Sequence, residues 1–393
     1  NTYASQHLGA GTEQRAPAYA WNGLWLSVIF SVLLLPYTLS LPGLFSMMEH
    51  DAHMAALETR FAQTLLLGSV LTLSSRALAQ FFYGVHRPGV VLAAVVAGNV
   101  TNFVCNYVLI FGSASLGVPA LGVPGAAIGM LIGLTVELAV PLAVFLGRGM
   151  NERMGTRGAW RFSAAHVRDL ARSGWPAALM YGSEMASWTV FMVFLVGRFG
   201  AQQQQASWIA QRFMQLSFMP AVGVSFAVTA VVGRCLGAGR PDLARRRAWL
   251  GIRCAMVYMG VCAVLMLALR HRLAWLFIEH GTSEKDAATI VAVAGDIMVV
   301  AAVFQVFDGL GIVIVGVLRG AGDTLWPGVA TVVLSWTCIV GGGFAMVKLA
   351  PELGAVGPWI GAGVYIVALG GSLGWRFAGG AWAERRLLRE SAG

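Results

Sequence analysis

The chain has 393 residues, of which 57% are hydrophobic and only 11% are charged, and its formal net charge is +9. A soluble domain carries about twice that fraction of charged residues, so the composition excludes an ordinary water-soluble globular protein. A basic net charge also suits proteins that bind nucleic acid, but here the arginines are distributed over many polar loops and form no single patch. We therefore expect the lipid bilayer as a partner and no nucleic acid.

Ten apolar segments are long enough to cross a bilayer as helices, which takes about 20 residues. In chain order they are 23–47, 57–82, 90–112, 125–147, 174–198, 208–235, 250–269, 288–317, 325–347 and 354–378. Of the 27 lysines and arginines, 17 lie in the ends of the chain and in the loops of one side, and five lie in the loops of the other side. Because basic loops stay in the cytoplasm, we expect both ends of the protein on the cytoplasmic side.

A duplication is visible in the string Leu8-Gly9-Ala10-Gly11, which recurs 228 residues later at 236–239. At the same offset, seven of the fourteen positions from Leu8 to Trp21 are identical. Self-similarity of this kind indicates two copies of one helical unit. In the second copy, about 60 apolar residues precede the string, whereas only seven residues precede it in the first copy. We therefore expect that the first copy lacks its first two helices.

The polar segment 149–173 separates the two copies. The predicted organisation is an N-terminal bundle of four helices at 1–148, a basic cytoplasmic linker at 149–173, and a C-terminal bundle of six helices with a basic tail at 174–393. Within the linker, residues 160–170 have the pattern of a short amphipathic helix on the inner membrane surface. The predicted fold class is an all-α integral membrane protein with two parallel bundles, a plan typical of transporters. A duplicated receptor or scaffold is the alternative.

No nucleotide-binding, serine hydrolase or zinc protease motif occurs in the chain, so we expect no enzyme activity and no cofactor. The five cysteines lack paired spacing and are interpreted as small buried hydrophobic residues. Glu49, His50, Asp51 and His53 stand close together between two spans, and we interpret them as a solvated loop and expect no metal site.

Two acidic residues lie deep in apolar spans of the second copy, Glu184 and Asp308. A charged side chain at the bilayer centre costs about 3 kcal/mol on the insertion scale. Neither residue has a lysine or arginine three or four positions away to neutralise it. A carboxyl group in such a place takes up a proton or binds a small cation, which is the chemistry of an ion-coupled antiporter. The alternative is a protonated acid that only joins helices by a hydrogen bond.

Other polar and aromatic residues in the spans are candidates for the same cavity. Asn99, Asn102 and Asn106 share one helical face, where amides need partners in the protein or in a wet cavity. Flexible methionines and flat aromatic rings suit varied organic cations, although packing explains such residues equally simply. The candidates for the substrate cavity are Tyr181, Trp188, Met192, Gln211, Met214, Phe218, Phe304 and Gln305.

Several of these residues stand in motifs by which the chain resembles the multidrug and toxic compound extrusion (MATE) family. The motifs are Gln305-x-x-Asp308, the string Leu318-Arg319-Gly320-Ala321-Gly322-Asp323-Thr324, Phe218-Met219-Pro220 followed by residues 232–242, and Asn102-x-x-x-Asn106 followed by Leu121-Gly122. The resemblance covers nearly the whole chain. It implies twelve helices in two bundles of six, and export of small organic cations in exchange for H⁺ or Na⁺ by alternating access.

The resemblance also implies residue roles. It places Glu184 on family helix seven and Asp308 on family helix ten, as the two acids tied to ion coupling in the NorM-like branch. Asn102 and Asn106 match a polar pair on family helix five, whose partner acid on helix one is not in this chain. Phe304 stands where related transporters have a tyrosine, which favours protons over Na⁺. We expect a monomer in the plasma (inner) membrane.

Two alternatives stay open at this stage. A flippase for lipid-linked cargo from the same superfamily would need cationic residues in its cavity, and the sequence offers few of them. A truncated membrane protein that transports nothing is the second alternative.

Overall fold

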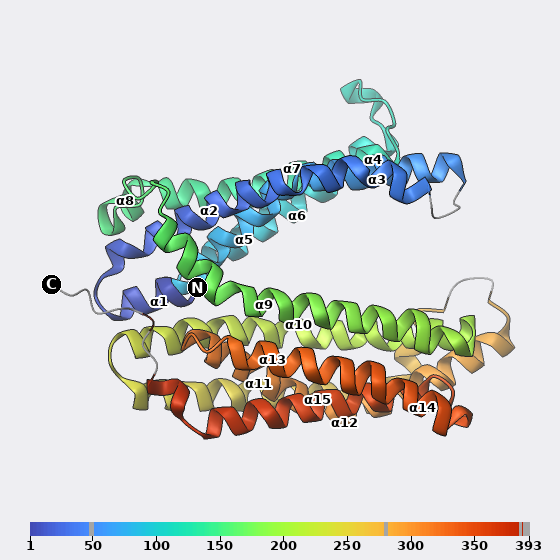
Figure 1. The fold of residues 1–393 in the computed structure, drawn as a ribbon. Helices are drawn as coiled ribbons and strands as arrows, with labels where there is room; N and C mark the ends of the chain where they lie inside the picture. The colour runs from blue at the N-terminus through green and yellow to red at the C-terminus, as the bar shows by residue number, and fades with distance from the viewer. Residues whose placement is uncertain (47–50, 279–281, 385–386, 388–393) are drawn as a thin grey trace. The chain divides into compact units, whose positions relative to one another are not determined.

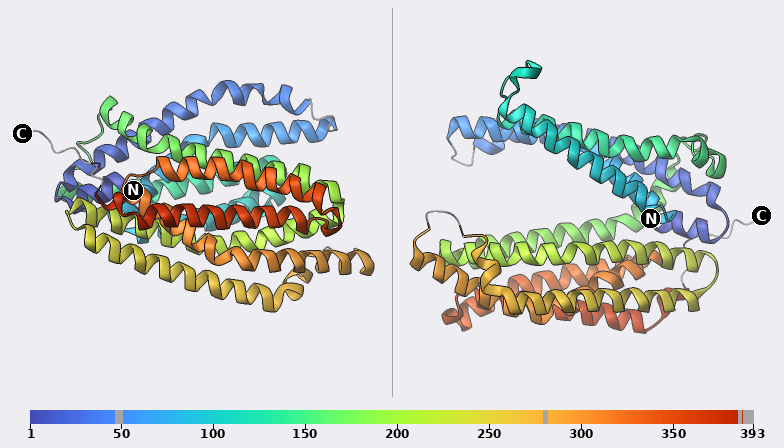
Figure 2. Two further views of the ribbon diagram at one scale, coloured as in Figure 1. Left: turned by 60° about the horizontal axis from the view of Figure 1, so that its bottom comes forward. Right: turned by 180° about the vertical axis from the view of Figure 1, so that it is seen from behind.

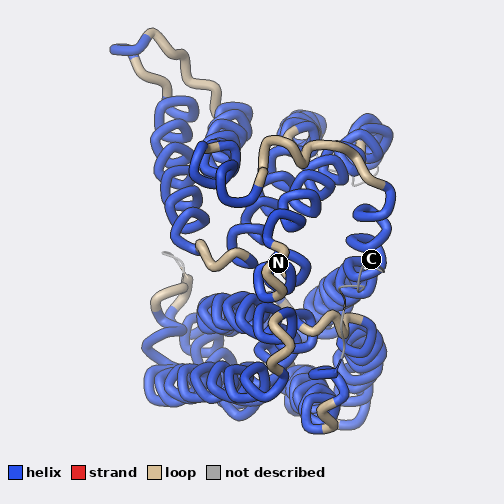
Figure 3. The backbone as a smooth tube through the Cα atoms, turned by 90° about the vertical axis from the view of Figure 1, so that its left-hand side faces the viewer, coloured by secondary structure: helices blue, strands red, loops and turns tan. Residues whose placement is uncertain are grey.

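The computed structural model describes residues 1–46, 51–278, 282–384 and 387, and among these residues it contains helices and turns but no β-strand (Figure 3). The described part of the chain divides into two compact units. One comprises Asn1 and Tyr3–Leu170, and the other comprises Thr2 and Ala171–Gly393. The boundary at 170 and 171 falls inside the segment 149–173 that we interpret as a linker. Each unit is described by itself below.

The N-terminal unit contains α1 to α8 (Figure 1). Its helices are α1 (Thr2–Gly9), α2 (Ala16–Leu33), α3 (Leu35–Ser46), α4 (Ala52–Leu67), α5 (Ser69–Gly84), α6 (Pro88–Phe111), α7 (Val123–Leu146) and α8 (Arg148–Met154), with short 3-10 turns at Glu13–Arg15 and Ala114–Leu116. The first 3-10 turn, α2 and α3 form one candidate membrane span, Glu13–Ser46. The α4–α5 pair is bent by 42° at Gly68 and forms a second span, and α6 and α7 are the third and fourth.

The C-terminal unit contains six candidate spans. Its helices are α9 (Ala164–Val190), α10 (Ala201–Gly237), α11 (Pro241–Trp275), α12 (Glu284–Gly320), α13 (Leu325–Leu334), α14 (Gly343–Leu349) and α15 (Val356–Ala378). After α9 the chain continues through a π-helical turn at Phe191–Val196 and a 3-10 turn at Gly197–Phe199, and a π-helical segment at Ser335–Gly342 joins α13 to α14. Two further 3-10 turns lie at Pro351–Leu353 and Ala381–Glu384. The helix α12 packs against α10, α11 and α15.

The prediction of an all-α membrane protein with about ten spans is confirmed: the described residues contain nine apolar helices of sufficient length, or ten with the bent pair counted as one span. One local prediction is wrong. Residues 164–170 do not form a separate surface helix but the first turns of α9. Ser163 starts this helix, because its carbonyl accepts from the amide of Val167 at 3.0 Å. Neither Gly174 nor Pro176 then interrupts it.

The duplicated Leu-Gly-Ala-Gly string ends a helix in both copies. The last glycine of each copy has a positive φ, 71° at Gly11 and 70° at Gly239, and Gly322 in the Leu318–Thr324 string has 81°. In each turn the next amide donates to the carbonyl five residues earlier: Thr12 to His7 at 3.0 Å, Arg240 to Cys235 at 2.9 Å and Asp323 to Leu318 at 2.8 Å. This is the bond of a Schellman cap, which favours glycine at the left-handed position. One turn type therefore recurs at three helix ends.

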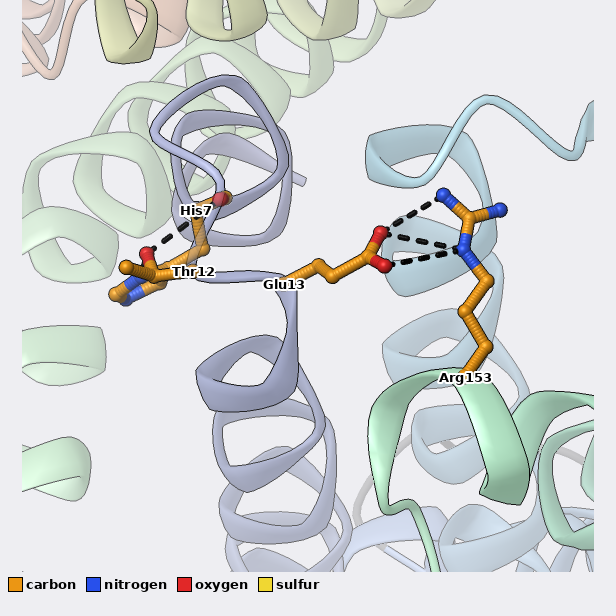
Figure 4. Close-up of polar contacts among 4 residues, drawn as sticks. All are labelled: His7, Thr12, Glu13 and Arg153. Carbon is orange, nitrogen blue, oxygen red and sulfur yellow. Dashed lines mark hydrogen bonds and ion pairs between the residues drawn. The ribbon is translucent and has the colours of Figure 1, made fainter.

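The first of these turns is held to α8 by an ion pair (Figure 4). Glu13 follows the turn directly, and its Oε2 accepts from Nη2 of Arg153 at 2.7 Å. Thr12 Oγ1 shares a hydrogen bond of 2.9 Å with Nδ1 of His7, so the two ends of the turn are also joined by side chains. Both contacts lie within the N-terminal unit.

Replacing Gly239 by Ala is expected to lower the free energy of unfolding by about 1–2 kcal/mol, because an L-residue pays this cost in the left-handed region. Thermal unfolding in detergent measures it. The matched control is Gly374→Ala in α15, where the added Cβ meets no atom within 4 Å and the backbone is helical. That variant is expected to unfold at or above the parent temperature. Equal midpoints for the two variants would contradict the role of the turn.

Close helix contacts in both units depend on glycine. In the N-terminal unit, α6 and α7 lie side by side (Figure 2), and glycines of α7 face asparagines of α6. In the C-terminal unit, a Cβ on Gly316 of α12 would lie 2.6 Å from the carbonyl oxygen of Ser225 in α10. Thr229 Oγ1 donates to the carbonyl of Gly316 at 2.8 Å, which adds a hydrogen bond to the same contact. Small residues and hydroxyl bonds of this kind drive helix association in lipid.

Candidate functional site

Glu184 and Tyr365 connect α9 to α15 inside the C-terminal unit. The Tyr365 hydroxyl donates to Oε1 of Glu184 at 2.9 Å. Tyr365 is only 1% exposed, whereas Glu184 is half-buried. Glycines allow α15 to come this close to its neighbours, since a Cβ on Gly361 would lie 2.8 Å from the amide nitrogen of Gly343. The carboxyl group of Glu184 is therefore held in place and keeps one oxygen for a further partner.

Asp308 brings a second carboxyl group to the same place from α12. It is half-buried, and it lies close enough to Glu184 and to Tyr365 for its charge to interact with both. Within the described ranges, neither acid forms an ion pair with a lysine, an arginine or a histidine. Two carboxyl groups whose charges interact in an apolar unit repel each other when both are ionised. The pair is therefore suited to hold a proton or a cation.

An arginine of the Leu318–Thr324 turn lies near Glu184 but three turns of α12 away from Asp308. Arg319 Nη1 donates to the Tyr181 hydroxyl at 3.4 Å, and the Arg319 guanidinium carbon stands 5.2 Å from the centre of the Tyr181 ring. The positive charge also interacts with Glu184, which is three residues from Tyr181 in α9. The guanidinium group and the Tyr181 ring thus form a cation–π contact. A contact of this kind contributes about 0.5–2 kcal/mol.

The other cavity candidates fall into two groups. Met192, Phe304 and Gln305 are each 1% exposed and belong to the interior of the unit. Gln305 Nε2 donates to Ser217 Oγ of α10 and lies 3.7 Å from Met259 Sδ of α11, so it joins three helices. The remaining candidates are half-buried or exposed, namely Tyr181, Trp188, Gln211, Met214 and Phe218. For all eight, contact with a substrate stays a prediction.

Asn102 and Asn106 lie between α6 and α7 of the N-terminal unit. Asn106 Nδ2 donates to Asn102 Oδ1 at 3.3 Å. A Cβ on Gly133 of α7 would lie 2.7 Å from the Cβ of Asn102, and a Cβ on Gly129 would meet Asn106, so the two asparagines face glycines of α7. Asn102 Nδ2 and Asn106 Oδ1 are buried without a hydrogen-bond partner. By contrast, Asn99 is exposed and donates to its own helix at the carbonyl of Val95.

Tyr365 and Arg319 were not among the predicted site residues. Each can be found only through its contact with a residue far away in sequence, 181 positions in the case of Tyr365 and Glu184. Among the residues that the structure describes, no three His, Cys, Asp or Glu side chains are placed to hold a metal ion. Glu49 and His50, which we interpret as part of a solvated loop, lie outside the described residues.

Helices that span a membrane in two compact units, with paired acids inside one of them, define a membrane transport protein. The family model named MatE matches residues 1–108 and 176–342, and the chain belongs to this family. The recognition of the family from its motifs is therefore confirmed.

Relatives and solved structures agree with this assignment. The probable multidrug resistance protein NorM of Pseudomonas syringae pv. tomato is 30% identical over 100% of this chain and 83% of the relative. The multidrug resistance protein NorM of Burkholderia vietnamiensis is 29% identical over 94% of this chain and 78% of the relative. A crystal structure of MATE in complex with MaL6 superposes with a TM-score of 0.87 at 21% identity, and covers 98% of this chain and 83% of that one. The two relatives are named as multidrug resistance proteins, the first of them as a probable one.

Proposed function

We propose that this protein is a multidrug efflux antiporter that exports small organic cations in exchange for H⁺ or Na⁺. The observation that carries the proposal is the hydrogen bond from Tyr365 to Glu184, with a second carboxyl group, Asp308, near enough for its charge to act on both, from three helices of one membrane-embedded unit. Two relatives that span nearly the whole chain are named as multidrug resistance proteins or probable ones. We also propose that it works as a monomer in the plasma (inner) membrane with both ends of the protein in the cytoplasm.

The proposed mechanism is competition for one pair of carboxyl groups by alternating access. When the site faces outward, Glu184 and Asp308 take up the coupling ion and release the organic cation. When it faces inward, they lose the ion and bind the next organic cation. Because two positive charges cannot both be stabilised by the pair, the two fluxes are coupled. The Tyr365 hydroxyl positions Glu184 for this exchange.

The residues beside Asp308 favour H⁺ as the coupling ion. Phe304, one turn before Asp308 on α12, is 1% exposed in the apolar interior and offers no oxygen ligand. Na⁺ prefers several oxygen ligands, whereas a proton needs only a carboxylate oxygen. The hydroxyl of Tyr365 does not replace the missing ligand, because it is already hydrogen-bonded to Glu184.

Proteoliposomes with an imposed gradient test the proposal. We expect purified protein to drive ethidium uphill when a pH or Na⁺ gradient is imposed, and to stop when an ionophore collapses that gradient. Liposomes without protein are the control. A receptor, a scaffold or an inactive paralogue would move no dye under either gradient, and that result would contradict an antiporter.

A further inference from the structure

An open cavity of about 680 Å³ lies along the first turns of α11, the helix that follows the turn at Gly239. It is lined by Leu243, Arg246, Arg247, Trp249, Leu250 and Arg253. Its volume falls within the range of about 300–1,000 Å³ that is usual for small-molecule sites. Spacings of three, four and seven residues place most of this lining on one face of the helix.

The three arginines of this cavity carry charge that no acidic residue neutralises. All three are exposed, and within the part of the chain that the structure describes none has an ion pair or a hydrogen bond. Asp242, at the start of the helix, is also exposed and forms no ion pair with them. Such a cluster attracts an anion.

The same face of α11 becomes apolar toward the middle of the helix. Val257, Val261 and Val264 continue the stripe of Leu243 and Leu250, and they are 69%, 54% and 64% exposed. Within a membrane-spanning helix, exposed valines of this kind face acyl chains. Trp249, which is 50% exposed, stands among these arginines, between Arg247 and Arg253, and tryptophan is enriched at membrane surfaces. The ligand of this face thus needs an anionic head and apolar tails.

We propose that this arginine cavity of α11, Leu243 to Arg253, binds the phosphate headgroup of an anionic phospholipid, with its acyl chains along Val257, Val261 and Val264. Guanidinium groups bind phosphate oxygens in pairs of parallel hydrogen bonds, which suits them to this ligand better than lysines. Basic pockets beside spanning helices on the cytoplasmic side recognise such headgroups. The site is separate from Glu184 and Asp308, and the proposal does not depend on the transported substrate.

Native mass spectrometry of the purified protein tests the proposal with phosphatidylglycerol, phosphatidylethanolamine and inorganic phosphate as separate ligands. We expect phosphatidylglycerol to bind in preference to phosphatidylethanolamine, and inorganic phosphate alone not to be retained. The triple variant Arg246→Gln, Arg247→Gln and Arg253→Gln is expected to bind phosphatidylglycerol about 100-fold more weakly, at about 1 kcal/mol per arginine. The matched control is Arg272→Gln at the other end of α11, which is expected to bind like the parent.

Unchanged phosphatidylglycerol binding in the triple variant would overturn the proposal. Retention of inorganic phosphate by the parent as strongly as phosphatidylglycerol would also overturn it, because the arginines would then bind a free anion. A second measurement uses the parent chain, in case the triple variant does not fold. Brominated phosphatidylglycerol is expected to quench the fluorescence of the parent more than that of Trp249→Phe, which lacks the tryptophan of the cavity. Equal quenching of these two proteins would equally contradict the proposal.

Discussion

Replacing Asp308 by Asn is expected to reduce drug resistance in a sensitised host to the level of the empty vector. Asn has nearly the same shape as Asp but can neither take up a proton at neutral pH nor balance a cation, so the exchange at the pair fails. Export of ethidium, followed by its fluorescence in cells, measures the effect. Immunoblotting of the membrane fraction shows that the variant is present in the same amount as the parent.

The matched control for this prediction is Asp296→Asn on the same helix. Asp296 is exposed and stands twelve positions before Asp308 in α12, so it has no part in the proposed pair. We expect this variant to export ethidium at the parent rate. Export that persists unchanged in Asp308→Asn, or that is lost equally in both variants, would contradict the coupling role of Asp308.

Replacing Gly316 by Val is expected to destabilise the protein by roughly 3 kcal/mol or more, at the upper end of what overpacking costs. The new side chain would collide with the backbone of Ser225, and it would separate the hydroxyls of Ser225 and Thr229 from the carbonyls of α12 that they reach at 2.8 Å. The measurements are the yield of monodisperse protein and its thermal midpoint in detergent.

Gly371→Val in α15 is the control for the Gly316 variant, because a Cβ at Gly371 meets no atom within 4 Å. Its midpoint is expected to stay within a few degrees of the parent or to rise slightly, since valine forms helix somewhat better than the glycine it replaces. A Gly316→Val protein as stable as Gly371→Val would show that α10 and α12 do not pack as described.

The membrane spans and the two acids are predictable from the sequence because each has a local signal. A run of apolar residues marks a span, and a carboxyl group inside such a run is costly enough to stand out, as Glu184 and Asp308 do. The turns at Gly11 and Gly239 are also predictable, because glycine marks the left-handed position. The turn at His86 is not, although Arg87 donates to Phe82 at 2.9 Å in the same way, because His86 takes the positive φ of 57° in place of glycine.

The partners of the acids have no local signal. Tyr365 looks in the sequence like any tyrosine of a glycine-rich span, and only the tertiary fold brings it within hydrogen-bond distance of Glu184. Arg319 stands in the Leu318–Thr324 turn, whose Asp323 pairs with Arg376 of α15 at 2.9 Å. The contact of Arg319 with Tyr181 depends on the tertiary fold, since the two residues are 138 positions apart in the sequence. Phe304 and Gln305 are buried because they lie on the face of α12 that packs against other helices. The sequence does not reveal which face this is, since the span is hydrophobic on all sides.

Binding of ethidium to the purified protein as a function of pH and Na⁺ shows whether one carboxyl pair serves both the organic cation and the coupling ion. Fluorescence anisotropy measures the affinity. We predict that it weakens on acidification or on addition of Na⁺, approaching about tenfold per pH unit where one proton is exchanged, and that Asp308→Asn removes the dependence. An affinity that is the same at every pH and Na⁺ concentration would contradict the account.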